Sequence, residues 1–500
     1  MPKVMGRQLC IVAVLFAALL TACATRYGYH RDELYFLAAG KHLDWGYADQ
    51  PPLVPLLARA MSAIDADSLL LLRLPSILAA TFVVVCAGLM ARELGGGRGA
   101  QILASVAVAS AAMVLGIGHL LSTASFDMAA VALVCLLVLL LLRDSEARHV
   151  ERNRADEHRP IAPQWWLAAG LVVGIGLQNK LLLIFPVAAL VLALILVGPR
   201  KVFATRYFPM AVGLAVAIWL PYLVWQANND WPQWELSRAI AGGSSGTSDS
   251  LFAFVLSQFG LMGPLLAPLW GFGLWRLWRD ARRRAFVVAY AVLFVVFAAS
   301  GGKAYYLGGM YPVLLAAGAV PVAARLGDRR IRWAAVGSVL TVNGVASAVL
   351  FLPVLPVSTL RDSPVLAINY DAGETIGWPE FVARIGEVRA RLGPDVAILT
   401  DNYGEAGAIE RFGAAYDLPI PHSGHNSYWW WGPPSDSATA VLTVGIGRDQ
   451  LAGVFGEIEP AGHIDNGLGI DNDEQGQPLF ICRAPRASLA QLWPQAKQLS

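Results

Sequence analysis

Eleven long apolar segments are the feature that most limits what this chain can fold into. A helix needs about 20 apolar residues to cross a bilayer. The segments lie at residues 9–25, 69–91, 101–119, 125–142, 165–179, 181–198, 207–226, 251–275, 285–300, 307–324 and 333–356. We therefore predict a polytopic α-helical membrane protein with about eleven transmembrane helices.

The composition agrees with this prediction. The chain has 500 residues, of which 56% are hydrophobic and 15% charged, and its mean hydropathy is +0.52. Soluble proteins carry about 25% charged residues. The net charge of +2 gives no reason to expect a nucleic-acid partner. The five cysteines show neither metal-ligand spacing nor a disulfide framework. We predict no specific cofactor, and a divalent cation is left open.

Arginine is concentrated in alternate loops, which predicts the orientation. With a cytoplasmic N-terminus, the inside loops are residues 92–98, 143–163, 199–206, 276–284 and 325–332, and each is rich in arginine. An odd number of spans then leaves the tail outside. We expect a multi-pass protein of the inner (cytoplasmic) membrane with an extracytoplasmic tail. One alternative is lipoprotein processing at Cys23, which would remove the first helix.

The tail differs in character from the rest of the chain. We predict a transmembrane module at residues 1–356, whose first outer loop (26–68) carries an acidic motif, and a soluble extracytoplasmic α/β domain at residues 357–500. Short apolar runs predict strands and longer periodic segments predict helices. The predicted strands are Val396–Thr400 and Ala440–Val444, and the predicted helices are Trp378–Leu392 and Glu405–Phe412.

Several polar residues are expected at the outer face of the membrane. Asp32 and Glu33 are adjacent carboxylates directly after the first span, where ionisable groups are costly and usually functional. The other candidates are His30, Arg59, His119, Asp127, Lys180, Lys303 and Tyr305. A carboxylate can deprotonate an attacking hydroxyl while cations neutralise a phosphate leaving group. Asp32 and Asp127 could also hold a divalent cation.

Seven segments together resemble a known family. They are DELYFLAAGKHLDWGYADQPPL, STASFDM, GIGLQNKLLLIFP, WQANNDWP, GGKAYYLGGMYPVLLAAGA and, in the tail, TDNYGEAGAIERFG and SGHNSYWWWGP. In this order they resemble bacterial family 39 glycosyltransferases, which are related to protein O-mannosyltransferases and to enzymes that add aminoarabinose to lipid A. The resemblance implies a GT-C fold and inverting transfer from a polyprenyl-phosphate sugar to an extracytoplasmic lipid, glycan or protein.

The same resemblance implies roles for individual residues. Asp32 would be the catalytic base, supported by Glu33, and Asp127 would match the second acidic position. Lys180 and Lys303 would bind the donor phosphate. Arg59 and Tyr305 complete that phosphate-binding set, and His30 and His119 are supporting residues. The chain departs from the family pattern at Asn179, where a threonine or serine is usual.

Ordinary structural roles remain open for each candidate. The acidic pair could be a solvated turn, Asp127 a helix N-cap, Lys180 a snorkelling side chain, and Lys303 part of an interfacial belt. At the level of the whole protein, the alternatives are a lipid or sugar transporter or flippase, and a non-catalytic membrane scaffold. The sequence identifies neither the sugar nor the acceptor.

Overall fold

The computed structural model describes residues 2–151, 163–242 and 250–499, which form two compact units. The helical unit comprises Met1–Cys23, Arg73–Asn228 and Ile240–Leu352. The mixed unit comprises Ala24–Leu72, Asn229–Ala239 and Pro353–Ser500. The segment that carries the acidic motif therefore shares a compact unit with the tail. Most of the predicted inside loop 143–163 lies outside the described residues.

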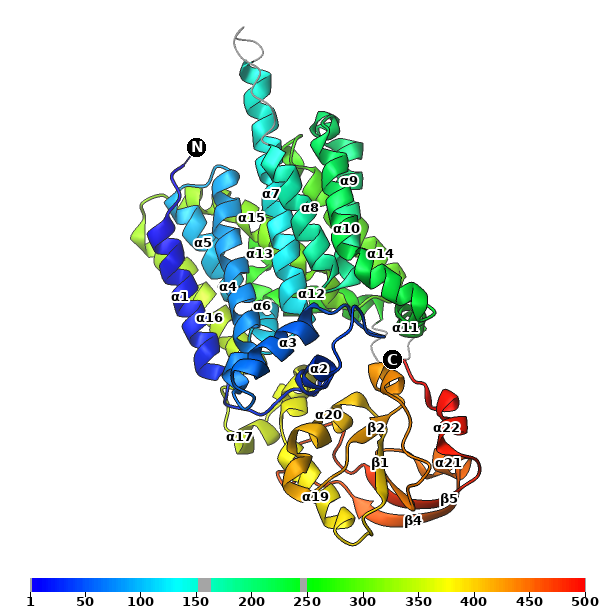
Figure 1. The fold of residues 1–500 in the computed structure, drawn as a ribbon. Coiled ribbons are helices and arrows are strands. Elements are labelled where there is room, and N and C mark those ends of the chain that lie inside the picture. Colours follow the sequence, from blue (N-terminus) through cyan, green and yellow to red (C-terminus); the bar gives the residue numbers. More distant parts are fainter. Residues whose placement is uncertain (1, 152–162, 243–249, 500) are drawn as a thin grey trace. The chain divides into compact units, whose positions relative to one another are not determined.

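Every predicted apolar segment contains helix in the structure (Figure 1). The α-helices that make up the helical unit are α1 (Gly6–Cys23), α4 (Leu69–Glu93), α5 (Arg98–Ala109), α6 (Ala112–Gly118), α7 (Thr123–Glu151), α8 (Pro163–Leu177), α9 (Ile184–Val197), α10 (Tyr207–Asn228), α12 (Leu251–Met262), α13 (Ala267–Arg279), α14 (Ala285–Ala299), α15 (Tyr311–Leu326) and α16 (Arg330–Phe351). Short 3₁₀ helices join them: η1 (Leu181–Leu183), η2 (Arg200–Phe203), η3 (Pro264–Leu266) and η4 (Ala304–Met310).

The number of spans depends on how bent helices are counted. Within the described residues, six helices are long and apolar enough to cross a membrane, and two bent pairs raise the number to eight. The pairs are α5–α6, bent by 61°, and α12–α13, bent by 85°. Four further apolar helices in the described part of the chain are shorter: α3 (Leu53–Ile64), α8, α9 and α14. The polytopic helical class is confirmed, whereas the number of eleven stays a prediction.

The sharp bend between α12 and α13 has a local cause. Gly263 has a φ of +88°, a conformation that favours glycine, and Pro264 follows it. The Asn343 amide donates to the carbonyl of Ser110 at 2.8 Å and fills the space beside Gly263, where a Cβ would collide with it. The sequence at the bend therefore ends α12 and starts a new helix.

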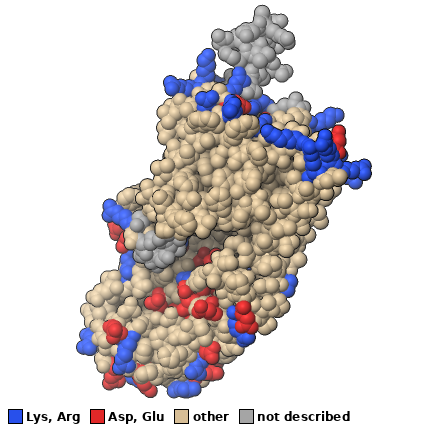
Figure 2. All heavy atoms as spheres, turned by 180° about the vertical axis from the view of Figure 1, so that it is seen from behind, with Lys and Arg blue, Asp and Glu red and all other residues tan. Residues whose placement is uncertain are grey.

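Basic side chains gather at one end of the helical unit (Figure 2). Exposed members of this group are Arg200, Lys201, Arg206, Arg279, Arg282, Arg325, Arg329 and Arg330. They follow or precede α9, α10, α13, α14, α15 and α16 at the loops predicted to be cytoplasmic. The multi-pass arrangement is shown, and the orientation in the membrane stays a prediction.

Helices α13 and α15 approach each other through two glycines. A Cβ on Gly273 would collide with the carbonyl oxygen of Leu314, and one on Gly318 would collide with that of Leu269. Small residues permit such close helix contacts in membranes, where association depends on van der Waals packing. This crossing therefore depends on the absence of side chains at both positions.

We expect Gly318→Leu to destabilise the helical unit because the new side chain must push α13 away. Overpacking of this kind costs about 1–3 kcal/mol or more. Gly271→Leu is the matched control, since Gly271 lies in the partner helix α13 and nothing lies within 4 Å of a Cβ at this position. Monodisperse protein remaining after heating in detergent measures the effect. Equal losses for the two variants would contradict the packing argument.

The mixed unit contains a five-stranded sheet of order β2-β1-β3-β5-β4. Its strands are β1 (Val396–Thr400), β2 (Pro421–Ser423), β3 (Ala440–Val444), β4 (Phe455–His463) and β5 (Pro478–Pro485). Strand β1 pairs in parallel with β2 and β3, while β5 runs antiparallel to β3 and β4. The interior strands β1 and β3 are almost continuously apolar and buried, as expected for parallel strands covered on both faces. Both predicted strands are confirmed.

The mixed unit also contains α-helices and short 3₁₀ helices. They are α2 (Arg31–Lys41), α3 (Leu53–Ile64), α11 (Pro232–Ala241), α17 (Val357–Arg361), α18 (Val365–Ile368), η5 (Tyr370–Thr375), α19 (Trp378–Arg389), α20 (Tyr403–Phe412), η6 (Gly413–Tyr416), η7 (Asn426–Trp431), α21 (Arg448–Ala452), α22 (Leu489–Leu492) and η8 (Trp493–Ala496). Both predicted tail helices are present as α19 and α20. The first ends three residues earlier than predicted and the second begins two residues earlier.

Candidate active site

The two adjacent carboxylates of the acidic motif have different environments. The Asp32 N–H donates to His30 Nδ1 at 3.2 Å, and the His30 N–H donates to Glu33 Oε2 at 2.9 Å. These two bonds form a capping box that starts α2. Glu33 is fully buried, whereas the Asp32 side chain is 45% exposed. Glu33 therefore holds the helix start and leaves Asp32 accessible.

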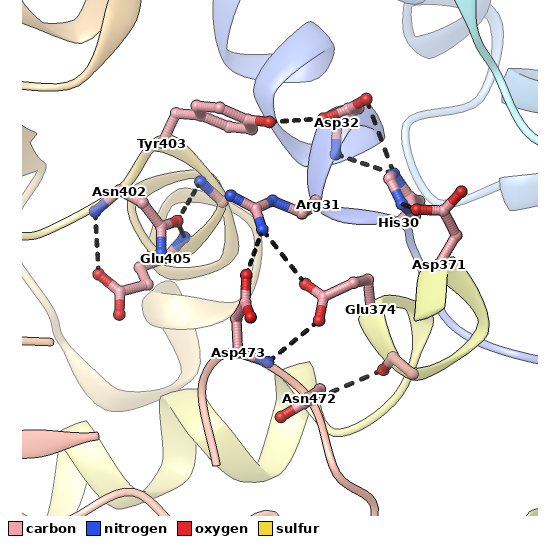
Figure 3. Close-up of polar contacts among 12 residues, drawn as sticks. His30, Arg31, Asp32, Asp371, Glu374, Asn402, Tyr403, Glu405, Asn472 and Asp473 are labelled. Atoms are coloured by element: carbon pink, nitrogen blue, oxygen red, sulfur yellow. Dashed lines mark hydrogen bonds and ion pairs between the residues drawn. The ribbon is translucent and has the colours of Figure 1, made fainter. Parts of the chain in front are cut away.

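One hydroxyl from the tail contacts Asp32. The Tyr403 hydroxyl, at the first residue of α20, donates to Asp32 Oδ1 at 2.8 Å (Figure 3). Burial, and then the negative charge of Asp32, raise the pKa of Tyr403 well above its ordinary value. The hydroxyl consequently remains a donor at neutral pH. Sequence analysis missed Tyr403, although it lies in a tail segment that resembles the family.

Arg31, next to Asp32, faces a different set of acids. Its Nη1 lies 2.8 Å from Asp473 Oδ2 and 3.6 Å from Glu374 Oε2 (Figure 3). The Asp473 N–H also donates to Glu374 Oε1 at 3.1 Å. This network joins the start of α2 to η5 and to the segment before β5.

Glu374 is buried in this region, as are Glu405 and Glu474. Burial raises the pKa of all three, and the negative charge of Glu474 adds to the effect on Glu405. Neither carboxyl oxygen of Glu474 has a hydrogen-bond partner in the described part of the chain. The folded state therefore binds protons in this region more tightly than the unfolded chain does.

We expect the mixed unit to lose stability as the pH rises from about 5 towards 9. A carboxyl group whose pKa is raised by folding stabilises the fold while it is protonated, and this stabilisation is lost as the pH rises through the folded-state pKa. Each such group contributes about 1.4 kcal/mol per pH unit within that window. Glu474→Gln cannot ionise, so it should reduce the slope and be more stable than the unchanged protein at pH 8–9.

Glu459→Gln is the control for this experiment, since Glu459 is exposed on β4 and pairs with Arg483 at 3.0 Å. Unfolding midpoints in detergent, followed by tryptophan fluorescence from pH 5 to 9, give the slopes. A Glu474→Gln slope equal to that of the control would refute a proton held at Glu474.

A second carboxyl group near Asp32 was not predicted. The Tyr35 hydroxyl donates to Asp49 Oδ1 at 2.6 Å. Burial raises the pKa of Asp49 to about 7, with a further contribution from the charge of Asp32 and against the lowering effect of the Tyr35 hydrogen bond. A group that titrates near neutral pH suits acid–base chemistry. Its place in the segment GYADQPPL was the only sequence signal that could have identified it.

The helical unit brings four of its polar residues together. Lys180 lies in an extended break between α8 and η1, and its Nζ is 5.2 Å from the ring centroid of Tyr305 and 5.8 Å from that of Tyr306. The charge of Lys180 also acts on Asp127. Asp127 is the fifth residue of α7, so it is not an N-cap, and its Oδ1 is buried with no hydrogen-bond partner in the described part of the chain.

Asn179 fixes the backbone next to Lys180. Its side-chain nitrogen donates to the carbonyl of Thr123, at the start of α7, at 2.9 Å. The amide thus ties the end of α8 to α7, four residues before Asp127. Asn179 differs from the threonine or serine that is usual in the family, but it is also polar, and its hydrogen bond positions the neighbouring backbone.

The remaining predicted residues are more dispersed. Lys303 lies directly before η4, and Arg59 is exposed on α3. His119 is the C-cap of α6, and its Nδ1 lies 3.3 Å from the carbonyl oxygen of Leu115 in that helix. Asp32 and Asp127 belong to different compact units. Within the described residues, no group of three or more His, Cys, Asp or Glu side chains is arranged to hold a metal ion.

Known proteins resemble this chain in sequence and in fold. The profile described as dolichyl-phosphate-mannose-protein mannosyltransferase matches residues 49–225. A lipid A galacturonosyltransferase of Rhizobium johnstonii is 26% identical over 396 residues, which cover 74% of this chain and 75% of that protein. The crystal structure of apo ArnT from Cupriavidus metallidurans has a TM-score of 0.61 and 16% identity, covering 94% of this chain and 97% of that one. The chain is a GT-C glycosyltransferase similar to family 39.

A second ArnT structure extends the fold comparison. ArnT from the same organism bound to undecaprenyl phosphate has a TM-score of 0.59 and 16% identity, covering 96% of this chain and 98% of that one. The GT-C fold thus extends over nearly the whole glycosyltransferase, tail included. The relatives favour an enzyme over the transporter and scaffold alternatives.

Proposed function

We propose that this glycosyltransferase moves a sugar from a polyprenyl-phosphate donor to an acceptor at the extracytoplasmic face of the membrane, with inversion at the anomeric carbon. The observation that carries the proposal is the environment of the Asp32 carboxylate. It is half-exposed and accepts the Tyr403 hydroxyl, whereas the neighbouring Glu33 is buried. A carboxylate that is fixed yet accessible suits a general base. The fold it shares with ArnT, which has been solved with undecaprenyl phosphate, supports the donor class.

In the proposed reaction, an acceptor hydroxyl oxygen attacks the anomeric carbon while the bond from that carbon to the phosphate oxygen breaks. Asp32 takes the hydroxyl proton, and the bonding electrons leave with polyprenyl phosphate. The phosphate is a good leaving group, so the enzyme's main contributions are positioning and charge stabilisation. Glu33 supports the base by fixing the helix on which Asp32 lies.

We assign the donor phosphate to Lys180, with Lys303, Tyr305 and Arg59 as further candidates. An ammonium group is a compact charge that binds phosphate strongly. The backbone break at Asn179 and Lys180 holds the side chain of Lys180 outside a regular helix, and the rings of Tyr305 and Tyr306 flank its Nζ. Asp127 would balance this charge in the absence of donor.

The acceptor is best sought among envelope lipids. The relative from Rhizobium johnstonii acts on lipid A, so lipid A is the first acceptor to assay, followed by glycans and proteins. Purified protein in nanodiscs would be incubated with undecaprenyl-phosphate sugars and each acceptor. In parallel, mass spectrometry would compare envelope lipids and glycans of cells with and without the gene. We expect one sugar-bearing product to disappear, and unchanged envelopes together with inactive purified protein would overturn the proposal.

A further inference from the structure

We infer that Tyr403, from the tail, is a positioning residue for the Asp32 carboxylate. This inference rests on the proposed function of Asp32 as the base. It gives the tail a part in the chemistry, because residue 403 lies 371 positions after Asp32 and on a different helix, α20.

The two carboxylate oxygens of Asp32 have different contacts. Oδ1 accepts the Tyr403 hydroxyl at 2.8 Å. Oδ2 lies 4.0 Å from His30 Nδ1, which is an ion-pair distance but longer than a hydrogen bond, and that nitrogen already accepts the Asp32 N–H. One oxygen is therefore fixed and the other is available to receive a proton.

A neutral donor suits this task better than a cation. A guanidinium paired with Asp32 would stabilise its charged form and weaken it as a base. Arg31, the adjacent cation, instead contacts Asp473 and Glu374 (Figure 3). The carboxylate is therefore oriented by a hydroxyl, while the adjacent guanidinium forms its ion pairs with other acids.

The hydroxyl of Tyr403 is itself held in place. Its ring lies 4.8 Å from the Tyr35 ring and 5.2 Å from the Arg31 guanidinium carbon, measured to ring centroids. A capping box precedes it: Asn402 Oδ1 accepts the N–H groups of Gly404 and Glu405, and Glu405 Oε2 accepts the Asn402 N–H. The start of α20 is consequently rigid.

Glycines bring α20 close to α2. A Cβ on Gly404 would lie 2.9 Å from Arg31 Cβ, and one on Gly407 would lie 2.9 Å from the carbonyl carbon of Leu34. Larger residues at these positions would separate the helices and move the hydroxyl away from Asp32. The sequence YGEAG thus contains both the tyrosine that donates to Asp32 and the two glycines that let α20 approach α2.

Tyr403→Phe tests the inference, because it removes only the hydroxyl. A hydrogen bond to a charged group contributes about 1.5–3 kcal/mol, so kcat should fall about 10- to 100-fold with KM values for donor and acceptor little changed. The acidic limb of the pH–rate profile should move to higher pH, since a carboxylate that has lost a donor is easier to protonate. A merely structural role would not move this limb.

Tyr428→Phe is the matched control. Tyr428 is another buried tyrosine of the mixed unit, and its hydroxyl donates to Glu410 Oε1 at 2.9 Å. It should retain the kcat and the pH profile of the unchanged protein. Assays run below the unfolding midpoint of each variant separate chemistry from stability.

Two results would overturn the inference. They are an unchanged kcat and pH profile in Tyr403→Phe, and a loss of kcat without any shift of the acidic limb. Failure of the proposed function gives a different result, because Asp32→Asn would then remain active whatever Tyr403→Phe does.

Discussion

Asp32→Asn should lower the transfer rate by about 10²–10⁴-fold, the usual cost of losing a general acid or base. The amide keeps the shape of the carboxylate, and its oxygen can still accept the Tyr403 hydroxyl, which donates to Asp32 Oδ1 at 2.8 Å in the unchanged protein. It cannot take a proton from the acceptor. Expression, unfolding midpoint and donor binding should therefore stay close to those of the unchanged protein while turnover is lost.

Two further variants make this experiment specific. Asp44→Asn, at an exposed carboxylate in the same segment, should leave turnover unchanged. Glu33→Gln should cost less than Asp32→Asn, because glutamine can still complete the capping box that Glu33 makes with His30. Turnover of Asp32→Asn at the rate of the unchanged protein would remove Asp32 from the mechanism.

Lys180→Met should weaken binding of the polyprenyl-phosphate sugar about 10- to 100-fold, as expected from loss of one hydrogen bond to a charged group. Methionine keeps the aliphatic stem against Tyr305 and Tyr306 but removes the charge. The apparent affinity for the acceptor should not change. Adding Lys303→Met should make the loss steeper, because both lysines are assigned to the donor phosphate.

Donor titration of purified variants in nanodiscs measures this effect. Lys201→Met is the control, since Lys201 is exposed in η2 at the basic end of the helical unit. If Lys180→Met binds donor as tightly as the control does, Lys180 is an interfacial anchor and the phosphate is held by other residues.

The sequence by itself determined the class of the protein and much of its local structure. Long apolar runs predicted the membrane helices, because crossing a bilayer demands a length and hydropathy that are visible in any window of about 20 residues. Strands β1 and β3 were predicted at their observed bounds, since buried strands are short continuous apolar runs. The break at Asn179 and Lys180 was also visible, because two polar residues interrupt an apolar run.

Only the tertiary structure decided what each acidic residue does. Asp32 and Glu33 are neighbours in sequence, yet the capping box buries one and leaves the other accessible. Asp127 had suited an N-cap, but α7 begins four residues earlier. The sequence could not identify Tyr403 as a partner of Asp32, because hydropathy patterns report only local burial. Their hydrogen bond joins residues 371 positions apart and forms only once α2 and α20 have packed together.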